Sequence, residues 1–564
     1  MKWTELSHRF GAAGVVQLVA LVLTLTHPSA RAASATWKSN PVSGDWNTAA
    51  NWTPATVPNG PTDVATFASS SQTAVSLSAN TEVGEIVFSA GASSFTISAS
   101  PGVTFSISGA GITNTSSVVQ NFVASAGPTS RGYLFFLGSA TAGDLVNITS
   151  QGTMGLEFAG ETVFDENSNA GSAVFITEAA LSEGFGGGYG AVVFEGTASA
   201  ANGTFITYGG AFSEAGAEVL FIRNATAADA TFITNPGTAR GGQGGFVSVG
   251  EVTNSAGSAT FISNGATVAG AFGGVTSVAG QPDNCTLLAD GGSGGGTGGE
   301  VLLIGSVFVP GGNERIKLSG NGSFYFGAGF TQDRESIGSL EGHGSVYPAS
   351  IPLAVGSNNL STIFRGVVRN DGQGGSLEKV GSGTLTLTNS NEYPGGTSVK
   401  QGKLVINNTL GSGTGSGPVV VNGGALGGTG IIAGAVTIGN SGRSALLTPG
   451  SSENLFATLT IKSNLAILSG ATLHVRVNSD NASAGAVTVS GVTISDAQFS
   501  LRDDGSSVLA VGTVIVPVNN TAAAPISGTF SNLPDGGVIT VGSNTFQANY
   551  EGGDGNDLTL TVVP

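Results

Sequence analysis

The chain has little charge and almost no cysteine, histidine or tryptophan. Charged residues make up 10% of its 564 residues, and it contains 1 cysteine, 4 histidines and 4 tryptophans. The single cysteine, Cys285, excludes an intramolecular disulfide, and so few His and Cys residues exclude a metal site built on them. We therefore expect coil packing and backbone hydrogen bonds to hold the chain together, with Cys285 as a small buried side chain rather than a reactive thiol.

Basic residues are also scarce. The formal net charge is −17, and removal of residues 1–32 leaves 16 basic against 35 acidic residues. An acidic surface repels phosphate backbones and anionic lipid, so we expect neither a nucleic-acid partner nor binding to membrane surfaces.

Long apolar runs are absent after the first 32 residues, so we expect no transmembrane segment in the mature chain. Residues 1–32 resemble a secretory signal peptide, with Lys2 and Arg9, then an apolar run from Gly11 to Thr26, then Ala30-Arg31-Ala32. A membrane anchor would need roughly 20 apolar residues, and this run has 16. The chain is therefore predicted to be exported through a cleaved signal peptide and to be extracellular or on the cell surface.

Glycine and strand-forming residues are what the chain has in abundance. Gly accounts for 91 residues, and 40% of the residues are hydrophobic. Disorder normally accompanies low hydrophobicity and high charge, whereas Gly suits turns and Val, Ile, Thr and Phe suit strands. This composition predicts an all-β chain with many turns.

The tripeptide Phe-Ile-Thr, with two degenerate copies, recurs at a nearly fixed interval. The steps are 28, 30, 27 and 29 residues, counted on Ile148, Ile176, Ile206, Ile233 and Ile262. Each unit also has a second apolar cluster beyond a Gly-rich turn: Leu156 to Phe158, Val192 to Phe194, Val219 to Phe221 and Phe246 to Val249. A short strand recurring at this interval is typical of a solenoid, here a parallel β-helix.

Stacked coils place equivalent residues one above another. We therefore predict one ladder of Phe205, Phe232 and Phe261 and a second ladder of Ile176, Ile206, Ile233 and Ile262 on the opposite strand face. Asn235 and Asn264, each following a repeat, are predicted to stack their amides at a turn.

Three tryptophans, Trp37, Trp46 and Trp52, lie near the start of the mature chain. An irregular aromatic cap that covers the exposed end of a solenoid is one interpretation. A platform for stacking sugars is the functional alternative. We favour the cap.

Residues from 377 onward resemble a known family. Leu377 to Thr388 reads LEKVGSGTLTLT, followed by Asn391, Tyr393, Gly395-Gly396-Thr397, Gly402-Lys403-Leu404 and Gly423 to Gly430. This order is similar to the autotransporter-associated β-strand repeat, although Asn389 stands where many members have Gly. The resemblance implies a right-handed β-helix of passenger type, secreted or displayed by bacteria.

Autotransporters of this kind end in a membrane β-barrel. Residues 460–564 lack a series of long amphipathic strands with interface aromatics. We therefore expect an exported passenger-type protein that lacks a C-terminal β-barrel.

Few residues are candidates for chemistry. His343 and His474 are the histidines that remain after the signal peptide, and Gly291 to Gly295 matches G-x-S-x-G without a strand–turn–helix setting. Gly552 to Leu560 begins like a calcium-binding nonapeptide, but Thr559 stands where a large apolar residue is needed. We expect a polar turn there and assign no catalytic, cofactor-binding or metal residue.

A carbohydrate-active β-helix enzyme would need clustered carboxylates. The carboxylates of the repeats do not recur at one ladder position: Glu178, Glu183, Glu195, Glu214, Glu218 and Glu251. We therefore predict no enzymatic activity and no cofactor.

The sequence divides into six predicted segments: a signal peptide (1–32), an N-terminal β region and cap (33–130), repeat coils (131–290), continuing β-helix (291–375), the autotransporter-associated repeat (376–450) and a C-terminal β region (451–564). We predict an all-β, right-handed parallel β-helix with an irregular N-terminal cap. Its predicted function is that of an exported, adhesin-like structural protein of the cell surface or medium, whose partners include surface glycans or other envelope components. A polysaccharide lyase or hydrolase and a glycan-binding protein are the alternatives.

Overall fold

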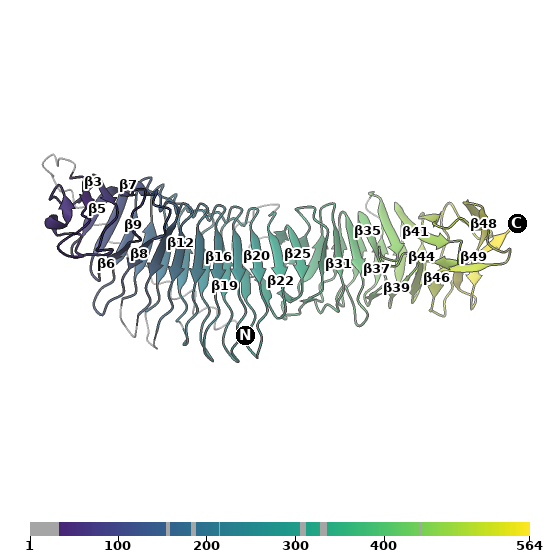
Figure 1. Cartoon of the computed structure of the whole chain (residues 1–564). Coiled ribbons are helices and arrows are strands. Elements are labelled where there is room, and N and C mark those ends of the chain that lie inside the picture. Colours follow the sequence, from purple (N-terminus) through teal and green to yellow (C-terminus); the bar gives the residue numbers. More distant parts are fainter. Residues whose placement is uncertain are drawn as a thin grey trace.

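The computed structural model describes residues 33–153, 158–181, 188–213, 215–304, 312–326, 335–439 and 442–564. These residues form one elongated stack of coils (Figure 1). Among them the helical element is the short 3-10 helix η1 (Ala49–Asn51), so the predicted all-β parallel β-helix is confirmed. Residues 1–32, the predicted signal peptide, lie outside the described residues.

The strands belong to four sheets. The N-terminal sheet contains, in spatial order, β2 (Trp52–Thr53), β1 (Ala35–Trp37), β3 (Gly60–Phe67), β5 (Thr81–Phe88), β7 (Thr104–Asn114), β9 (Tyr133–Phe136), β11 (Glu161–Phe164), β13 (Ala191–Phe194), β15 (Glu218–Phe221), β17 (Phe246–Val249), β19 (Val275–Val278), β21 (Glu300–Leu303), β23 (Ser323–Phe326), β26 (Ser345–Tyr347) and β29 (Val367–Val368).

The long sheet runs beside it and continues further. It contains β4 (Ala74–Leu77), β6 (Thr96–Ala99), β8 (Gln120–Ala124), β10 (Val146–Ser150), β12 (Val174–Thr177), β14 (Thr204–Thr207), β16 (Thr231–Thr234), β18 (Thr260–Ser263), β20 (Thr286–Ala289), β22 (Arg315–Leu318), β25 (Ser339–Gly342), β28 (Thr362–Phe364), β31 (Thr384–Leu387), β33 (Lys403–Ile406), β35 (Gly424–Gly428), β38 (Ala445–Pro449), β41 (Ala471–Asn478) and β45 (Gln498–Asp503), with β42 (Ser483–Ala484) antiparallel to β41.

Two further sheets complete the later coils. The C-terminal sheet contains β24 (Glu335–Ile337), β27 (Pro352–Val355), β30 (Ser376–Lys379), β32 (Thr397–Val399), β34 (Val419–Val421), β37 (Val436–Ile438), β40 (Leu465–Ile467) and β44 (Val492–Ile494). The distal sheet contains β36 (Ile431–Ile432), β39 (Thr458–Ile461), β43 (Ala486–Val489), β46 (Val514–Asn520), β49 (Asp557–Val563), β48 (Asn544–Gly552) and β47 (Val538–Val541), and its last strands pair antiparallel.

Phenylalanine ladders form the core of the repeat coils. Equivalent residues pair in parallel register, with Phe205 beside Phe232 and Phe232 beside Phe261. Their rings stack at centroid distances of 4.8 Å, and a second ladder of Phe164, Phe194 and Phe221 stacks at 4.8 Å on the N-terminal sheet. Every ring of both ladders is fully buried. The predicted phenylalanine ladder is therefore confirmed.

The predicted isoleucine ladder is confirmed from Ile176 to Ile262, and so is the asparagine pair, whereas the count on Ile148 was wrong: Ile148 is fully buried and pairs with Phe175 on the inward face. Ile206 pairs with Ile233 and Ile233 with Ile262 on the outward strand face. Asn264 Nδ2 donates to Asn235 Oδ1 at 3.1 Å. Of the apolar cluster expected at Leu156 to Phe158, residues 156 and 157 lie outside the described residues. Phe158 is 43% exposed, and the strand of this coil that pairs with β13 is β11.

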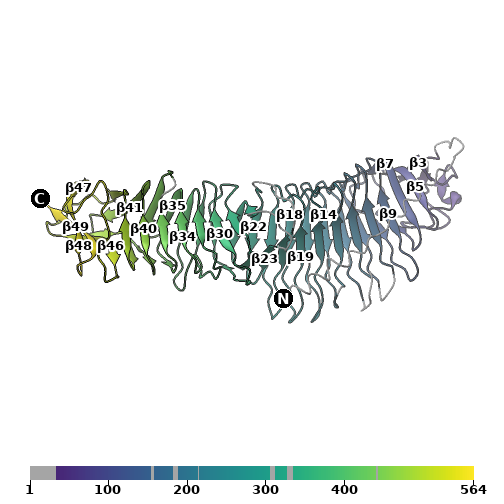
Figure 2. The same ribbon diagram turned by 180° about the vertical axis from the view of Figure 1, so that it is seen from behind.

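The connections that leave the long sheet stack into a thin glycine-rich layer. We call this layer the glycine fin and define it as residues 208–213, 215–217, 235–245, 264–274 and 290–299. These loops project from one side of the coils (Figure 1, Figure 2). The outgoing limb of each loop donates to the returning limb of the next: Gly210 N–H to Gln243 O, Gly237 N–H to Phe272 O and Ala266 N–H to Thr297 O, each at 2.8 Å.

Glycine is required in the fin because neighbouring backbones are in contact. A Cβ on Gly244 would lie 2.1 Å from the Gly273 carbonyl oxygen, which no side chain tolerates. The equivalent glycines in the other loops, Gly216, Gly273 and Gly298, meet the next carbonyl at 2.0, 2.2 and 2.3 Å. The high glycine content of the chain thus has a steric cause in this layer.

The three tryptophans close the N-terminal end. Trp37, Trp46 and Trp52 are 1%, 0% and 0% exposed, and Trp52 lies edge-to-face against both others at 5.0 and 4.9 Å. Phe67 packs against the cluster. Buried rings cannot stack on a sugar, so the cap interpretation is confirmed and the platform interpretation is wrong. Cys285 is also fully buried, as expected, and burial raises the pKa of its thiol.

Candidate binding face

Charge is unevenly distributed along the outer face of the long sheet. From β10 to β20 the outward positions hold uncharged residues: Asn147, Thr149, Val174, Ile176, Thr204, Ile206, Thr231, Ile233, Thr260, Ile262, Thr286 and Leu288. From β22 onward, outward positions include Arg315, Lys317, Glu341, Lys403, His474, Arg476 and Arg502. The outer face of the sheet is therefore charged only in its C-terminal part.

The first charged group lines a shallow hollow. Arg315 Nη2 lies 2.8 Å and Lys317 Nζ 3.4 Å from Glu341 Oε1. The hollow measures about 480 Å³, and its lining includes Lys317, Glu341, Ile363 and Arg365. Glu341 thus pairs with both Arg315 and Lys317 in this hollow.

The second charged group lies on β33, β41 and β45. We call Lys403, His474, Arg476 and Arg502 the basic cluster. Arg476 and Arg502 are direct neighbours in register, and each donates through Nε to Asp504, at 2.5 and 3.0 Å. These hydrogen bonds hold the pKa of the Asp504 carboxyl below its ordinary value, with the Arg476 bond as the larger cause.

His474 is the centre of this group. Its Nδ1 lies 3.1 Å from Ser500 Oγ. Burial lowers the pKa of the His474 imidazole, and the nearby Arg476 and Arg502 lower it further. The pKa of Lys403 is lowered by burial first and then by Arg476. The four basic side chains therefore share one electrostatic environment.

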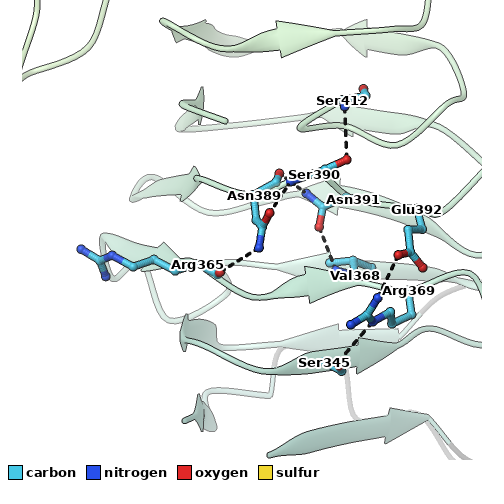
Figure 3. Close-up of polar contacts among 9 residues, drawn as sticks. All are labelled: Ser345, Arg365, Val368, Arg369, Asn389, Ser390, Asn391, Glu392 and Ser412. Atoms are coloured by element: carbon cyan, nitrogen blue, oxygen red, sulfur yellow. Dashed lines mark hydrogen bonds and ion pairs between the residues drawn. The ribbon is translucent and has the colours of Figure 1, made fainter. Parts of the chain in front are cut away.

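The corner of the repeat that resembles the autotransporter-associated family serves the fold (Figure 3). Asn391 Oδ1 accepts from the Val368 N–H at 2.8 Å, and Asn391 Nδ2 donates to Gly413 O at 2.7 Å. One side chain thus joins the coil before it to the coil after it. Arg369 Nη1 pairs with Glu392 Oε1 at 2.9 Å on the same corner.

Two further motif residues are also structural. Tyr393 is fully buried, and its hydroxyl lies 2.7 Å from Thr397 Oγ1. Lys379 is 1% exposed, and its ammonium donates to the carbonyl oxygens of Val380 and, at 2.9 Å, Gly381. Burial lowers the pKa of Lys379 to about 8. These motif residues are therefore engaged in contacts within and between coils.

The residues considered for catalysis lie apart from one another in the fold. His343 is exposed in the turn between β25 and β26, whereas His474 lies on β41. Ser293 of the G-x-S-x-G string lies in a loop of the glycine fin, where its N–H donates to Ala266 O at 2.8 Å. Within the described residues, Ser293 does not lie between a strand and a helix, which is the position that such a motif gives its nucleophile.

The segment Gly552 to Leu560 starts at the last residue of β48, turns at residues 553–556 and ends within β49. Asp557 is 7% exposed, and its Oδ1 accepts the N–H of Asn520 at 2.8 Å. Asp557 therefore anchors the backbone of β46. Within the described part of the chain, no group of three or more His, Cys, Asp or Glu residues could hold a metal ion.

The carboxylates of the repeats are engaged in the coils. Glu195 is buried, pairs with Arg223 at 3.0 Å, and has its pKa raised by burial and by nearby Asp165. Glu251 Oε2 accepts from the Arg223 N–H at 2.8 Å. Glu183 and Glu214 lie outside the described residues.

The comparisons with known proteins agree with the repeat inferred from the sequence. Residues 377–406 match the Passenger-associated-transport-repeat family, which confirms the predicted passenger-type repeat. The chain is 36% identical over 115 residues to the adhesin BmaC autotransporter of Brucella suis biovar 1 (strain 1330), covering 19% of this chain and 3% of that protein. The chain thus spans a small part of this curated relative's length.

A comparison of structures gives a more distant neighbour. The chain is similar to the crystal structure of the Haemophilus influenzae Hap adhesin, with 10% identity, 89% of this chain and 64% of that chain covered, and a TM-score of 0.25. Over the described residues, no helix has the length and apolar character needed to cross a bilayer.

Proposed function

We propose that this chain is an exported, adhesin-like β-helix protein that acts by contact along its sides and has no catalytic activity. The observation that carries the proposal is the passenger-type repeat at residues 377–406, set within a continuous parallel stack from β4 to β45. A stack of this kind presents long lateral faces rather than an enclosed pocket. The similarity of a 115-residue stretch to an autotransporter adhesin supports the same assignment.

The proposed location is extracellular or on the cell surface. The predicted signal peptide at residues 1–32 supports export. Surface glycans or other envelope components are the proposed partners.

Fractionation of bacteria that produce a tagged copy tests the location. We expect the tag in the medium or on the envelope, with an N-terminus beginning near Ala33. Retention in the cytoplasm with residues 1–32 intact would refute the proposal.

A second experiment tests whether the chain acts by adhesion or by catalysis. Beads coated with the purified mature chain are expected to adhere to cell surfaces more than uncoated beads. The same preparation, incubated with a panel of polysaccharides, is expected to release no new reducing ends or unsaturated products. Release that depends on the intact chain would overturn the assignment in favour of a lyase or hydrolase.

A further inference from the structure

Positive charge is concentrated in one part of an otherwise acidic molecule. Residues 33–314 contain 4 Lys or Arg against 20 Asp or Glu, residues 315–502 contain 12 against 9, and residues 503–564 contain none against 6. The basic cluster lies within the middle segment, on the outer face of the long sheet. Because the flanking segments are more negative, an anion meets less repulsion over this part of the chain than over the rest.

The two arginines of the cluster leave their terminal nitrogens available. Both bind Asp504 through Nε, and within the described residues no hydrogen bond engages an Nη atom of either. Arg502 is the more accessible, with 64% of its side chain exposed against 25% for Arg476. Adjacent coils are about 4.8 Å apart. Two arginines on backbones at that spacing can hold one carboxylate or sulfate between their guanidinium groups.

Lys403 extends the cluster along the coil axis. A Cβ on Gly427, in the next coil, would lie 3.4 Å from Lys403 Cε, so the lysine stem lies across this glycine. Gly427 pairs with Thr448, and in the two coils that follow His474 pairs with Ser500. The result is a low strip of glycine and hydroxyl side chains with cations at both ends.

We propose that the basic cluster binds the anionic groups of an acidic polysaccharide, with Arg476 and Arg502 holding one carboxylate or sulfate and Lys403 a second. The hydroxyls of Thr448 and Ser500 and the imidazole of His474 face the sugar between these groups. This inference deepens the proposed function and rests on it, because it names the class of partner that the adhesin-like surface takes.

The charge balance favours a polysaccharide over nucleic acid. Asp504 offsets one of the three permanent cations, so the cluster carries a modest net charge within a mature chain of 16 basic and 35 acidic residues. Closely spaced phosphates meet repulsion from both flanks. A polysaccharide has fewer charges per length and supplies hydroxyls that pair with the polar strip.

The test measures binding of the purified mature chain to polygalacturonate and to dextran sulfate, with neutral dextran as control. We expect saturable binding to one or both anionic polymers, weakened by salt, and none to neutral dextran. A preference for polygalacturonate identifies a carboxylate ligand, and a preference for dextran sulfate identifies a sulfate ligand.

Variants localise the site. Arg502→Gln, at an exposed position, is expected to weaken binding about tenfold or more, consistent with the loss of a charge-assisted contact. Asp504→Asn is expected to strengthen binding because it leaves both arginines unneutralised. Arg369→Gln, in the distant Glu392 pair, is the matched control and should bind as the unmodified chain does. Circular dichroism spectra confirm folding of each variant.

The inference is overturned if Arg502→Gln and Asp504→Asn both bind as the unmodified chain does, if neutral dextran binds equally, or if double-stranded DNA binds more tightly than either polymer. If the chain is exported and mediates adhesion of coated beads but fails these binding tests, the inference is wrong and the proposed function is unaffected. If the chain stays in the cytoplasm or cleaves polysaccharides, the proposed function itself is wrong.

Discussion

Replacement of Phe232 by alanine tests the ladder that holds the coils together. Its ring is fully buried, lies 4.8 Å from both Phe205 and Phe261, and meets Phe221 edge-to-face at 5.6 Å. Truncation of a buried phenylalanine costs about 3–5 kcal/mol. Since the ring has aromatic neighbours on three sides, each worth roughly 0.5–1.5 kcal/mol, we expect a loss of local stability toward the upper end of that range.

The matched control lies one residue away. Ile233 is on the same strand but faces outward and is only half-buried. Ile233→Ala is expected to cost roughly 1 kcal/mol, in line with surface-type substitutions. Both variants keep the strand's backbone pairing with β14 and β18, so the difference between them reports on the core ladder.

Hydrogen exchange read by mass spectrometry is the appropriate assay. A solenoid unfolds locally, because each coil contacts only its neighbours, so a single global free energy of unfolding is not defined. Phe232→Ala should speed exchange in β14, β16 and β18 and leave β43 and β46 unchanged. Equal loss of protection in the two variants, or loss that extends to β43 and β46, would refute the reasoning.

Three further outcomes are expected. Asn391→Ala should destabilise its corner by about 2 kcal/mol, since it removes two buried side-chain contacts to the backbone of about 1 kcal/mol each. Asn389→Ala loses only exposed contacts, to Arg365 O at 3.3 Å and from the Ser390 N–H at 2.8 Å, and should cost less by local hydrogen exchange; equal effects would contradict the joining role of Asn391. The Lys379 pKa of about 8 lies below its ordinary 10.5, so the locally unfolded chain binds one more proton between these values, and the local stability of its coil should rise with pH by up to about 3 kcal/mol. Hydrogen exchange in β30 and β31 at pH 7.5 and 9.5, corrected for the intrinsic exchange rate, should show this rise in the unmodified chain and not in Lys379→Met; identical pH dependence would argue against it. Trp46→Ala should unfold the cap, which would be seen as faster hydrogen exchange in β1 and β3. Retention of the variant on a glycan column should be unchanged. If the cap stays folded and retention is lost, the three tryptophans would instead form a sugar-binding platform.

The sequence was sufficient to predict the repeat core because its inward residues recur at nearly fixed spacing. One coil separates Phe205 from Phe232 and Phe232 from Phe261, so their alignment follows from counting residues. The burial of the tryptophans was likewise foreseeable, since a solenoid end has an apolar core to cover.

The basic cluster and the fin were not predictable in the same way. Lys403, Arg476 and Arg502 lie far apart in the chain and do not recur. Arg476 and Arg502 meet because they pair in register, whereas Lys403 lies in the column of Thr472 and Gln498. Gly291 to Gly295 was considered as a nucleophile motif, whereas it is one loop of a layer whose hydrogen bonds run between loops. Glycine composition alone does not tell a flexible linker from a close-packed backbone layer.

The glycine fin also restricts how such a protein changes over evolutionary time. Since the outgoing limb of one loop bonds the returning limb of the next, a lone insertion inside a loop shifts its partners on both sides out of alignment. Duplication of a complete unit, from one Phe-Ile-Thr to the next, adds a loop that already matches its neighbours. Growth of this region by whole-unit copying, with loop lengths inherited together, is the history that its geometry permits.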